Sequence, residues 1–245
     1  MHGGEAYMVE EVDQSGNVLS IWKTSSSPEG VKNLHQEIEG IHWYNSQNKN
    51  NIEVAVEKET LHYISLKYKF ISGEKAVFQN GYWLNRKWIS LAIEHYCEVW
   101  KWSSENNDGL YPLHGDFSLD NIIFIDDGPV ILDWEHFSMN VAPLGFDGLY
   151  LMFEALWFET GNKNPKPQTL AHLASMISLM RNRNCLDNRY KANPLSQIIQ
   201  FILKHSSLWG TQLKQYRNKL PILLFKENVV ENIDKEITIL IESVD

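Results

Sequence analysis

A set of polar side chains with a regular spacing lies in residues 112–137, PLHGDFSLDNIIFIDDGPVILDWEHF. His114, Asp116 and Asn121 form the pattern H-x-D-x-x-x-x-N, and Asp133 follows after a short apolar stretch. Phosphoryl transfer needs one carboxylate to orient the acceptor hydroxyl, and oxygen ligands for Mg²⁺ on the nucleotide phosphates. Asp116 could supply the first, and Asn121 and Asp133 could supply the second.

The element that must position these residues is a predicted β-hairpin. Residues 122–125 and 130–132 are apolar, and residues 126–129, Asp-Asp-Gly-Pro, form a turn between them. Such a hairpin holds a polar loop at each end. The alternative is that the Asp and Asn residues only make turns or cap helices, as they commonly do in loops.

The segments HGDFSLDNIIF and ILDWEHF resemble the aminoglycoside phosphotransferase and choline kinase group of small-molecule kinases. In that group D-W-E or D-F-E replaces the D-F-G of protein kinases. The resemblance implies an α+β, two-lobed, protein-kinase-like fold. A small antiparallel sheet with one helix would form a nucleotide-binding lobe and hinge over residues 1–73. Residues 74–245 would form a mostly helical lobe that carries the catalytic hairpin and binds the acceptor.

The resemblance also implies roles for the motif residues. Asp116 would orient or deprotonate the acceptor hydroxyl, and Asn121 and Asp133 would hold Mg²⁺. His114 would fix the catalytic loop by hydrogen bonding, because Asp116 already serves as the base. Gly115 stands where regulated protein kinases usually carry Arg, so no residue there could pair with a phosphorylated activation loop.

Upstream, residues 5–24 alternate apolar and polar positions on both sides of a turn at residues 13–17, which predicts a hairpin. The resemblance gives Lys23, near the end of its second strand, the role of anchoring the nucleotide phosphates. A helix should follow, with Ser25–Ser27 and Pro28 as its start signal. Glu37 on this helix would pair with Lys23, with Glu39 as the second choice.

The inward face of that helix is predicted from helical spacing. Its members are Val31, Leu34, Ile38, Ile41 and Trp43.

Residues 52–59 and 61–71 predict two more strands around a turn at residues 58–60. In the resemblance, backbone groups of Lys69 and Ile71 would read the edge of the nucleotide base.

The resemblance also implies a glycine-bearing turn over the nucleotide phosphates. Gly3 and Gly4 are the glycines at the position in the sequence where this turn would lie. The strand that leads into this turn is expected to be missing, through natural loss, a shortened chain or a start site placed too late. Its absence would leave an open sheet edge and weaken nucleotide capture.

The rest of the chain has helical periodicity. The predicted helices cover residues 85–102, 148–160, 166–182, 193–208, 210–217 and 224–243. Asp147 is expected to brace the catalytic loop or to act as a helix N-cap.

Composition limits the possible functions. The chain has 245 residues, 43% hydrophobic content and a net charge of −9, which suit a globular protein that does not bind nucleic acid. No stretch reaches the roughly 20 apolar residues of a membrane span, and no signal peptide is recognised, so a cytoplasmic location is expected. Cys97 and Cys185 are expected to be buried or incidental thiols.

The sequence therefore predicts a phosphotransferase that moves the γ-phosphate of ATP or GTP to a hydroxyl of a small molecule. An aminoglycoside, choline or another amino alcohol, a sugar and homoserine all remain open as acceptors. The alternatives are a catalytically weak or inactive nucleotide-binding or scaffold protein, and a protein kinase. Only thirteen residues separate Asp133 from Asp147, and no A-P-E motif follows, which favours a small acceptor over a protein.

Overall fold

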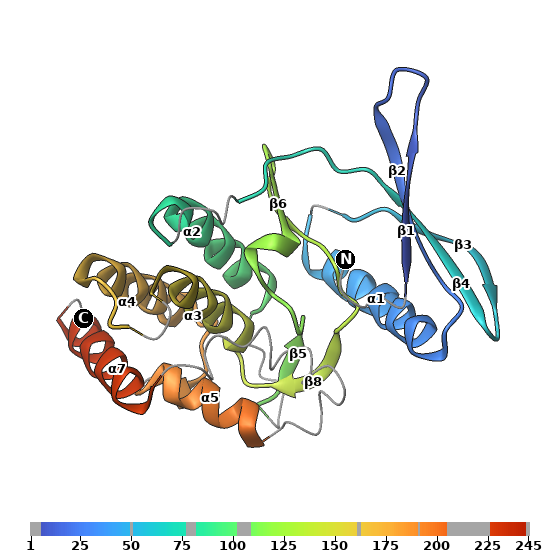
Figure 1. The fold of residues 1–245 in the computed structure, drawn as a ribbon. Coiled ribbons are helices and arrows are strands. Elements are labelled where there is room, and N and C mark those ends of the chain that lie inside the picture. Colours follow the sequence, from blue (N-terminus) through green and yellow to red (C-terminus); the bar gives the residue numbers. More distant parts are fainter. Residues whose placement is uncertain are drawn as a thin grey trace. The chain divides into compact units, whose positions relative to one another are not determined.

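The computed structural model describes residues 6–49, 51–76, 82–101, 109–160, 163–190, 192–204 and 226–243. These residues form an α+β protein with a four-stranded antiparallel sheet, two further two-stranded sheets and six α-helices (Figure 1). The predicted α+β class and the antiparallel sheet are confirmed. None of the described helices is both long enough and apolar enough to cross a membrane.

The contacts divide the chain into two compact units. The first unit contains Met1–Lys75, Pro112–Asp116 and Asn121–Asn140, and the second contains Ala76–Tyr111, Phe117–Asp120 and Val141–Asp245. The segment with the motif thus groups largely with the N-terminal residues, whereas the predicted boundary after residue 73 assigns it to the second lobe. Grouping by contacts does not show which parts fold independently, so that boundary stays a prediction.

The main sheet of the first unit has the strand order β1-β2-β4-β3. Its strands are β1 (Tyr7–Val12), β2 (Val18–Ser25), β3 (Val54–Thr60) and β4 (Tyr63–Lys69). The Asp13 carboxylate accepts the N–H groups of Ser15 and Asn17 and so closes the β1–β2 turn, as predicted.

The turn between β3 and β4 lies later than predicted. It consists of Leu61 and His62, because Thr60 still pairs with Tyr63. The polar residues 58–60 do not form the turn that the sequence predicts there. They belong instead to a strand at the edge of the sheet, where polar side chains can point into solvent.

Helix α1 (Pro28–Gln47) begins as predicted, because the Ser27 hydroxyl accepts the N–H of Gly30 at 3.0 Å. Its buried face differs from the predicted one. The buried residues are Gly30, Leu34, Glu37, Gly40, Ile41 and Tyr44. The inward face is therefore rotated toward Glu37, a charged residue that an apolar pattern cannot place inside.

Close packing joins α1 to the segment that follows Asp133. Trp134 is fully buried, and its indole N–H donates to the carbonyl oxygen of Ile131 at 2.8 Å. A Cβ at Gly40 would lie 2.7 Å from the Cβ of Trp134 and 2.9 Å from that of Phe137. Only glycine allows the helix to approach this closely.

The second unit contains most of the helices. They are α2 (Tyr82–Val99), α3 (Phe146–Thr160), α4 (Pro167–Asn182), α5 (Pro194–Lys204) and α7 (Glu227–Glu242). A short 3₁₀ turn, η3, covers Asn188–Tyr190. The predicted helix at 210–217 lies outside the described residues. The Asp234 carboxylate of α7 accepts the N–H groups of Leu195 and Ser196, and so caps the start of α5.

Asp147 is buried in the first turn of α3 and is not the residue that precedes the helix. The prediction that it is a plain N-cap is therefore wrong.

The prediction of two thiols is also wrong. Cys97 of α2 and Cys185, which follows α4, form a disulfide with their Cα atoms 5.3 Å apart. Both residues are buried, as expected. Their separation of 88 residues carried no pairing signal, because two cysteines alone do not form a recognisable framework.

The fit between α1 and Trp134 predicts the effect of substituting Gly40. Gly40→Ala places a methyl group against Trp134 and Phe137, so the free energy of unfolding should fall by about 1–3 kcal/mol. Chemical denaturation measures this change, and Glu39→Ala is the control because Glu39 is exposed on the same helix. Equal stability of Gly40→Ala and wild type would contradict the close approach.

Candidate active site

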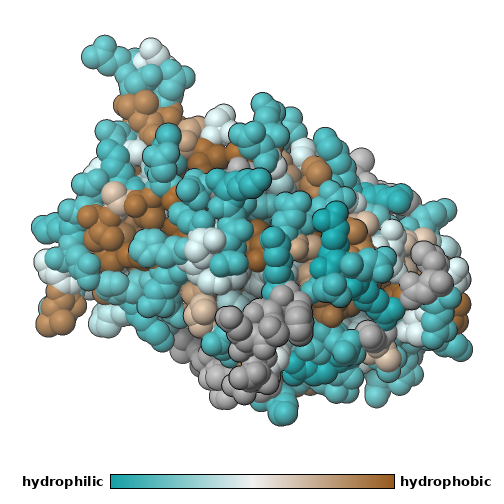
Figure 2. All heavy atoms as spheres, turned by 180° about the vertical axis from the view of Figure 1, so that it is seen from behind, coloured by the Kyte–Doolittle hydropathy of each residue, from teal (hydrophilic) through white to brown (hydrophobic). Residues whose placement is uncertain are grey.

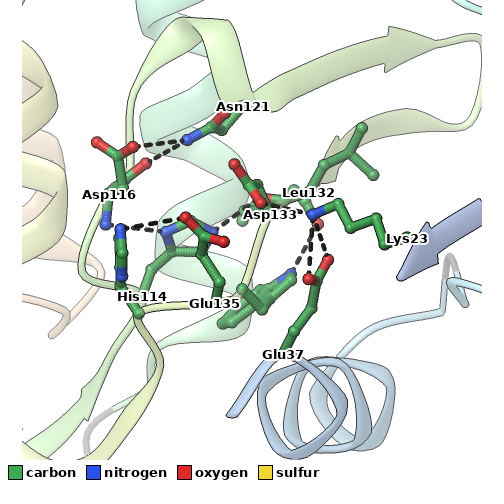
Figure 3. A network of polar contacts seen from close by, with 11 residues as sticks. Lys23, Glu37, His114, Asp116, Asn121, Leu132, Asp133 and Glu135 are labelled. Atoms are coloured by element: carbon green, nitrogen blue, oxygen red, sulfur yellow. Dashed lines mark hydrogen bonds and ion pairs between the residues drawn. The ribbon is translucent and has the colours of Figure 1, made fainter. Parts of the chain in front are cut away.

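Lys23, at the end of β2, connects two acidic residues of the first unit. Its ammonium nitrogen lies 2.8 and 3.0 Å from the carboxylate oxygens of Glu37 and 2.7 Å from Oδ1 of Asp133 (Figure 3). The exposed fractions of the side chains are 13% for Lys23, 2% for Glu37 and 38% for Asp133. The predicted pair Lys23–Glu37 is therefore present, and Asp133 shares the same cation.

The charges of Lys23, Glu37 and Asp133 stabilise one another. Burial disfavours the charge of Lys23, but Glu37 and Asp133 together raise its pKa above the ordinary value. Burial raises the pKa of Glu37, and the ammonium opposes that shift. Burial also acts against the ionised form of Asp133, yet Lys23 holds its pKa below the usual value of 3.8. The ionised Asp133 carboxylate thus adds to the free energy of unfolding above pH 3.8. This contribution is lost as the pH falls through its lowered pKa and the carboxylate takes up a proton.

Hydrogen bonds hold the motif loop, residues 114–133, at the end of the hairpin where β6 begins and β7 ends. The turn η2 (Leu119–Asn121) leads into β6 (Ile122–Ile125), which pairs with β7 (Gly128–Ile131). The Asn121 amide nitrogen donates to the backbone oxygen of Asp116 at 2.9 Å and to its Oδ2 at 3.2 Å. The Leu132 N–H donates to the Asn121 backbone oxygen at 2.8 Å.

His114 joins the two ends of this loop in a defined tautomer. Its Nδ1 accepts the N–H of Asp116 at 3.2 Å, so Nε2 carries the proton and donates to the Leu132 oxygen at 3.0 Å. The residue is fully buried, and burial lowers its pKa to about 4. A neutral ring with both nitrogens bonded to the backbone fits a structural role.

Two unusual backbone conformations direct the site residues. Gly115 has φ +87°, and a Cβ there would lie 2.7 Å from His136, so no Arg could occupy this position without rearrangement. Asp133 has φ +62°, a left-handed conformation that few residues adopt outside turns and functional sites.

The structure therefore connects the central predicted residues through one series of contacts. It runs from Asp116 to Asn121, then through Leu132 and Asp133 to Lys23 and Glu37. Glu39 is exposed and is not the partner of Lys23.

The residues predicted to read the base lie at the end of β4. Lys69 donates its N–H to the Glu53 oxygen at 3.1 Å, so this N–H is already bonded within the sheet. Ile71 lies just beyond the strand. Gly3 and Gly4 lie outside the described residues.

Sequence reasoning missed the packing that supports the site. The sequence predicts no role for Trp134 of the D-W-E motif, yet its ring contacts those of His114, Trp43, Tyr44 and Phe137. The signal that could have revealed it was Gly40, a glycine in the middle of a helix that marks a close approach.

The oxygen atoms near this loop suit a hard cation. Asn121 uses its amide nitrogen toward Asp116, so its Oδ1 can act as a ligand, and Asp133 offers Oδ2 because Lys23 takes Oδ1. The described residues contain no cluster of three or more His, Cys, Asp or Glu that would hold a metal alone. Mg²⁺ is typically bound by one or two protein oxygens together with phosphates and water, so the pair fits it.

Neither the family models nor the curated proteins that were compared match this chain.

The tautomer of His114 gives a testable pH dependence. Its pKa is about 4 in the folded protein against 6.5 for an ordinary histidine. Between pH 4 and 6.5 this histidine is therefore protonated in the unfolded chain and neutral in the folded protein. The free energy of unfolding should fall as the pH drops from 6.5 to 4. Buried His95 and His172, whose pKa values are also about 4, act in the same direction.

Nitrogen-15 NMR separates the individual rings. The His114 signal should show a protonated Nε2 and no titration above pH 5, with free histidine as the reference. A His114 ring that titrates near 6.5, or that carries its proton on Nδ1, would contradict the assigned network.

Proposed function

We propose that this protein is a small-molecule kinase that transfers the γ-phosphate of ATP or GTP to a hydroxyl group, within a two-lobed kinase-like fold. The observation that carries this proposal is the connected set of Lys23, Glu37, Asp133, Asn121 and Asp116. It combines a buried cation for phosphate, oxygen ligands for Mg²⁺ and a separate carboxylate for the acceptor. Phosphoryl transfer requires these three functions.

The residues have distinct tasks in the proposed reaction. Lys23 pairs with the nucleotide phosphates, and Glu37 keeps its ammonium in place. Asp116 orients the acceptor hydroxyl, whose oxygen forms the new bond to the γ-phosphorus while the bond to the bridging oxygen breaks. The hydroxyl proton passes to the Asp116 carboxylate, and the nucleoside diphosphate leaves. Mg²⁺ held by Asn121 and Asp133 would neutralise charge on the phosphates.

One face of the main sheet suits a nucleotide base. Met8 of β1 lies directly opposite Lys23 in the sheet register, and Leu19 and Ile21 precede Lys23 on the same face of β2. Met8 and Leu19 are exposed apolar side chains. They supply an apolar surface for the base on the face that carries the phosphate-binding lysine.

The acceptor is proposed to bind in the second unit. A cavity of about 430 Å³ there is lined by Gly109, Tyr111, Leu144, Asn184, Leu186, Asp187 and Asn188. Tyr111 begins β5 (Tyr111–Leu113), the strand that leads into the motif loop and pairs with β8 (Ser138–Ala142). The cavity lining combines amide, carboxylate and apolar groups, which suits a hydroxylated molecule of sugar or amino alcohol size.

Asp116→Asn tests the assignment of the base. The substitution keeps the backbone oxygen that accepts from Asn121, so the fold and nucleotide binding should persist. Acceptor-stimulated turnover should fall by about a thousandfold, because the proton acceptor is lost. The assay measures nucleoside diphosphate release with aminoglycosides, amino alcohols, sugars and peptides as acceptors.

The control is Asp126→Asn, which changes an exposed aspartate in the hairpin turn and should leave the rate unchanged. Near wild-type turnover in Asp116→Asn would exclude the proposed role. Nucleotide binding without turnover on any acceptor would favour the inactive nucleotide-binding protein, and a response to peptides alone would favour a protein kinase.

A further inference from the structure

Strand β1 is an edge of the main sheet with an unusual set of exposed side chains. Within the described part of the chain it pairs only with β2. Tyr7 is 75% exposed, Met8 64%, Val9 58% and Val12 52%. In Figure 2 apolar atoms reach the surface near the projecting strands. Exposed apolar edge strands are templates for pairing with another chain.

The opposite edge of the same sheet is protected. Strand β3 carries Glu57, Lys58 and Glu59 in succession, and its pairing is interrupted by an irregularity between Val56 and Lys58. Charges and bulges are the usual means by which edges avoid pairing. Strand β1 also has an irregularity, but it lies between Glu11 and Val12 at the end of the strand, and Tyr7 to Glu11 pair regularly with β2. Strand β1 is therefore the edge better suited to accept a strand.

We propose that β1 is a docking edge, and that its occupant is an extended segment of a different polypeptide in which apolar and basic residues alternate. The segment would add a fifth strand beside β1 through main-chain hydrogen bonds. Glu10 lies opposite Ile21, so one face of the docking edge adjoins the apolar surface proposed for the base. The docking proposal does not depend on the proposed function.

The two faces of β1 define the chemistry of the partner. Tyr7 and Val9 share one face with Trp22 and Thr24 of β2, so the partner should place apolar side chains there. Glu10 lies on the other face and has no ion-pair partner among the described residues. A lysine or arginine of the partner can pair with Glu10.

Glu11, the other acidic residue of β1, already has partners within the sheet. The Glu11 carboxylate accepts from Ser20 at 2.5 Å and pairs with Lys67 at 2.9 Å. These contacts hold its pKa at about 2, so it stays ionised without a partner strand. Glu10 is therefore the specific charge that the docking segment must meet.

Charge disfavours a second copy of this chain as the occupant. A two-fold pairing of β1 with itself brings Glu10 and Glu11 from both copies to one seam, and each copy has a net charge of −9. Like charges on neighbouring strands destabilise pairing. A basic segment from another protein removes this repulsion.

The probe for the experiment is a short fluorescent peptide of alternating valine and lysine. In an extended strand its valines face Tyr7 and Val9 while its lysines face Glu10. Binding is measured by fluorescence anisotropy on the full chain. Two further versions carry N-methyl groups on alternate residues, so that each blocks the hydrogen bonds of one edge of the peptide. One version should bind like the parent peptide, and the other should lose binding.

The protein variants test the position of the docking edge. Glu10→Lys should weaken binding of the valine–lysine peptide about fivefold or more and favour a valine–glutamate peptide. The matched control is Glu57→Lys, the same charge reversal on the other edge strand, and it should bind like wild type. Circular dichroism checks that both variants are folded.

Several results would overturn the proposal. These are no binding of the valine–lysine peptide at millimolar concentration, equal binding of both methylated versions, or an equal effect of Glu10→Lys and Glu57→Lys. A dimer in sedimentation experiments that Val9→Lys dissociates would identify the second copy as the occupant and would also overturn it.

Discussion

The contact on which the first unit depends is the Lys23 ammonium held between the carboxylates of Glu37 and Asp133. It joins a strand, a helix and the end of the hairpin, which are distant in the sequence. Glu37 is the buried member of this group, and removing one partner of a buried ion pair commonly costs about 3–5 kcal/mol. Two carboxylates share one lysine, so the group carries an excess of negative charge. In the proposed reaction that excess suits a divalent cation.

Packing and backbone geometry hold these charges in place. The fully buried Trp134 follows Asp133 directly and lies against Gly40, one helical turn beyond Glu37. The same ring contacts His114, whose two nitrogens bond to backbone groups at both ends of the motif loop. One indole thus supports both halves of the candidate site. The left-handed conformation of Asp133 turns its carboxylate toward Lys23 while Trp134 stays buried.

Local signals in the sequence were sufficient for much of this arrangement. The Ser27 cap, the Asp13 turn and the hairpin after Asn121 follow from residue types at fixed spacing, and the structure has all three. Long-range pairings were not accessible in the same way. The Cys97–Cys185 disulfide gave no local pattern, and charged residues on β3 resemble a turn because an edge strand can be polar. Glu37 was found by resemblance, since hydrophobic periodicity places a glutamate outside.

The dependence of ATP affinity on Mg²⁺, measured by calorimetry, tests the central claim most directly. Wild type and the exposed hairpin variant Asp126→Asn should both bind ATP more tightly when Mg²⁺ is added. Asp133→Asn should lose that gain, because the carboxylate that meets both Lys23 and the cation is gone. If Mg²⁺ raised the ATP affinity of Asp133→Asn as much as that of wild type, the claim that Lys23, Asp133 and the metal ion meet at this site would be wrong.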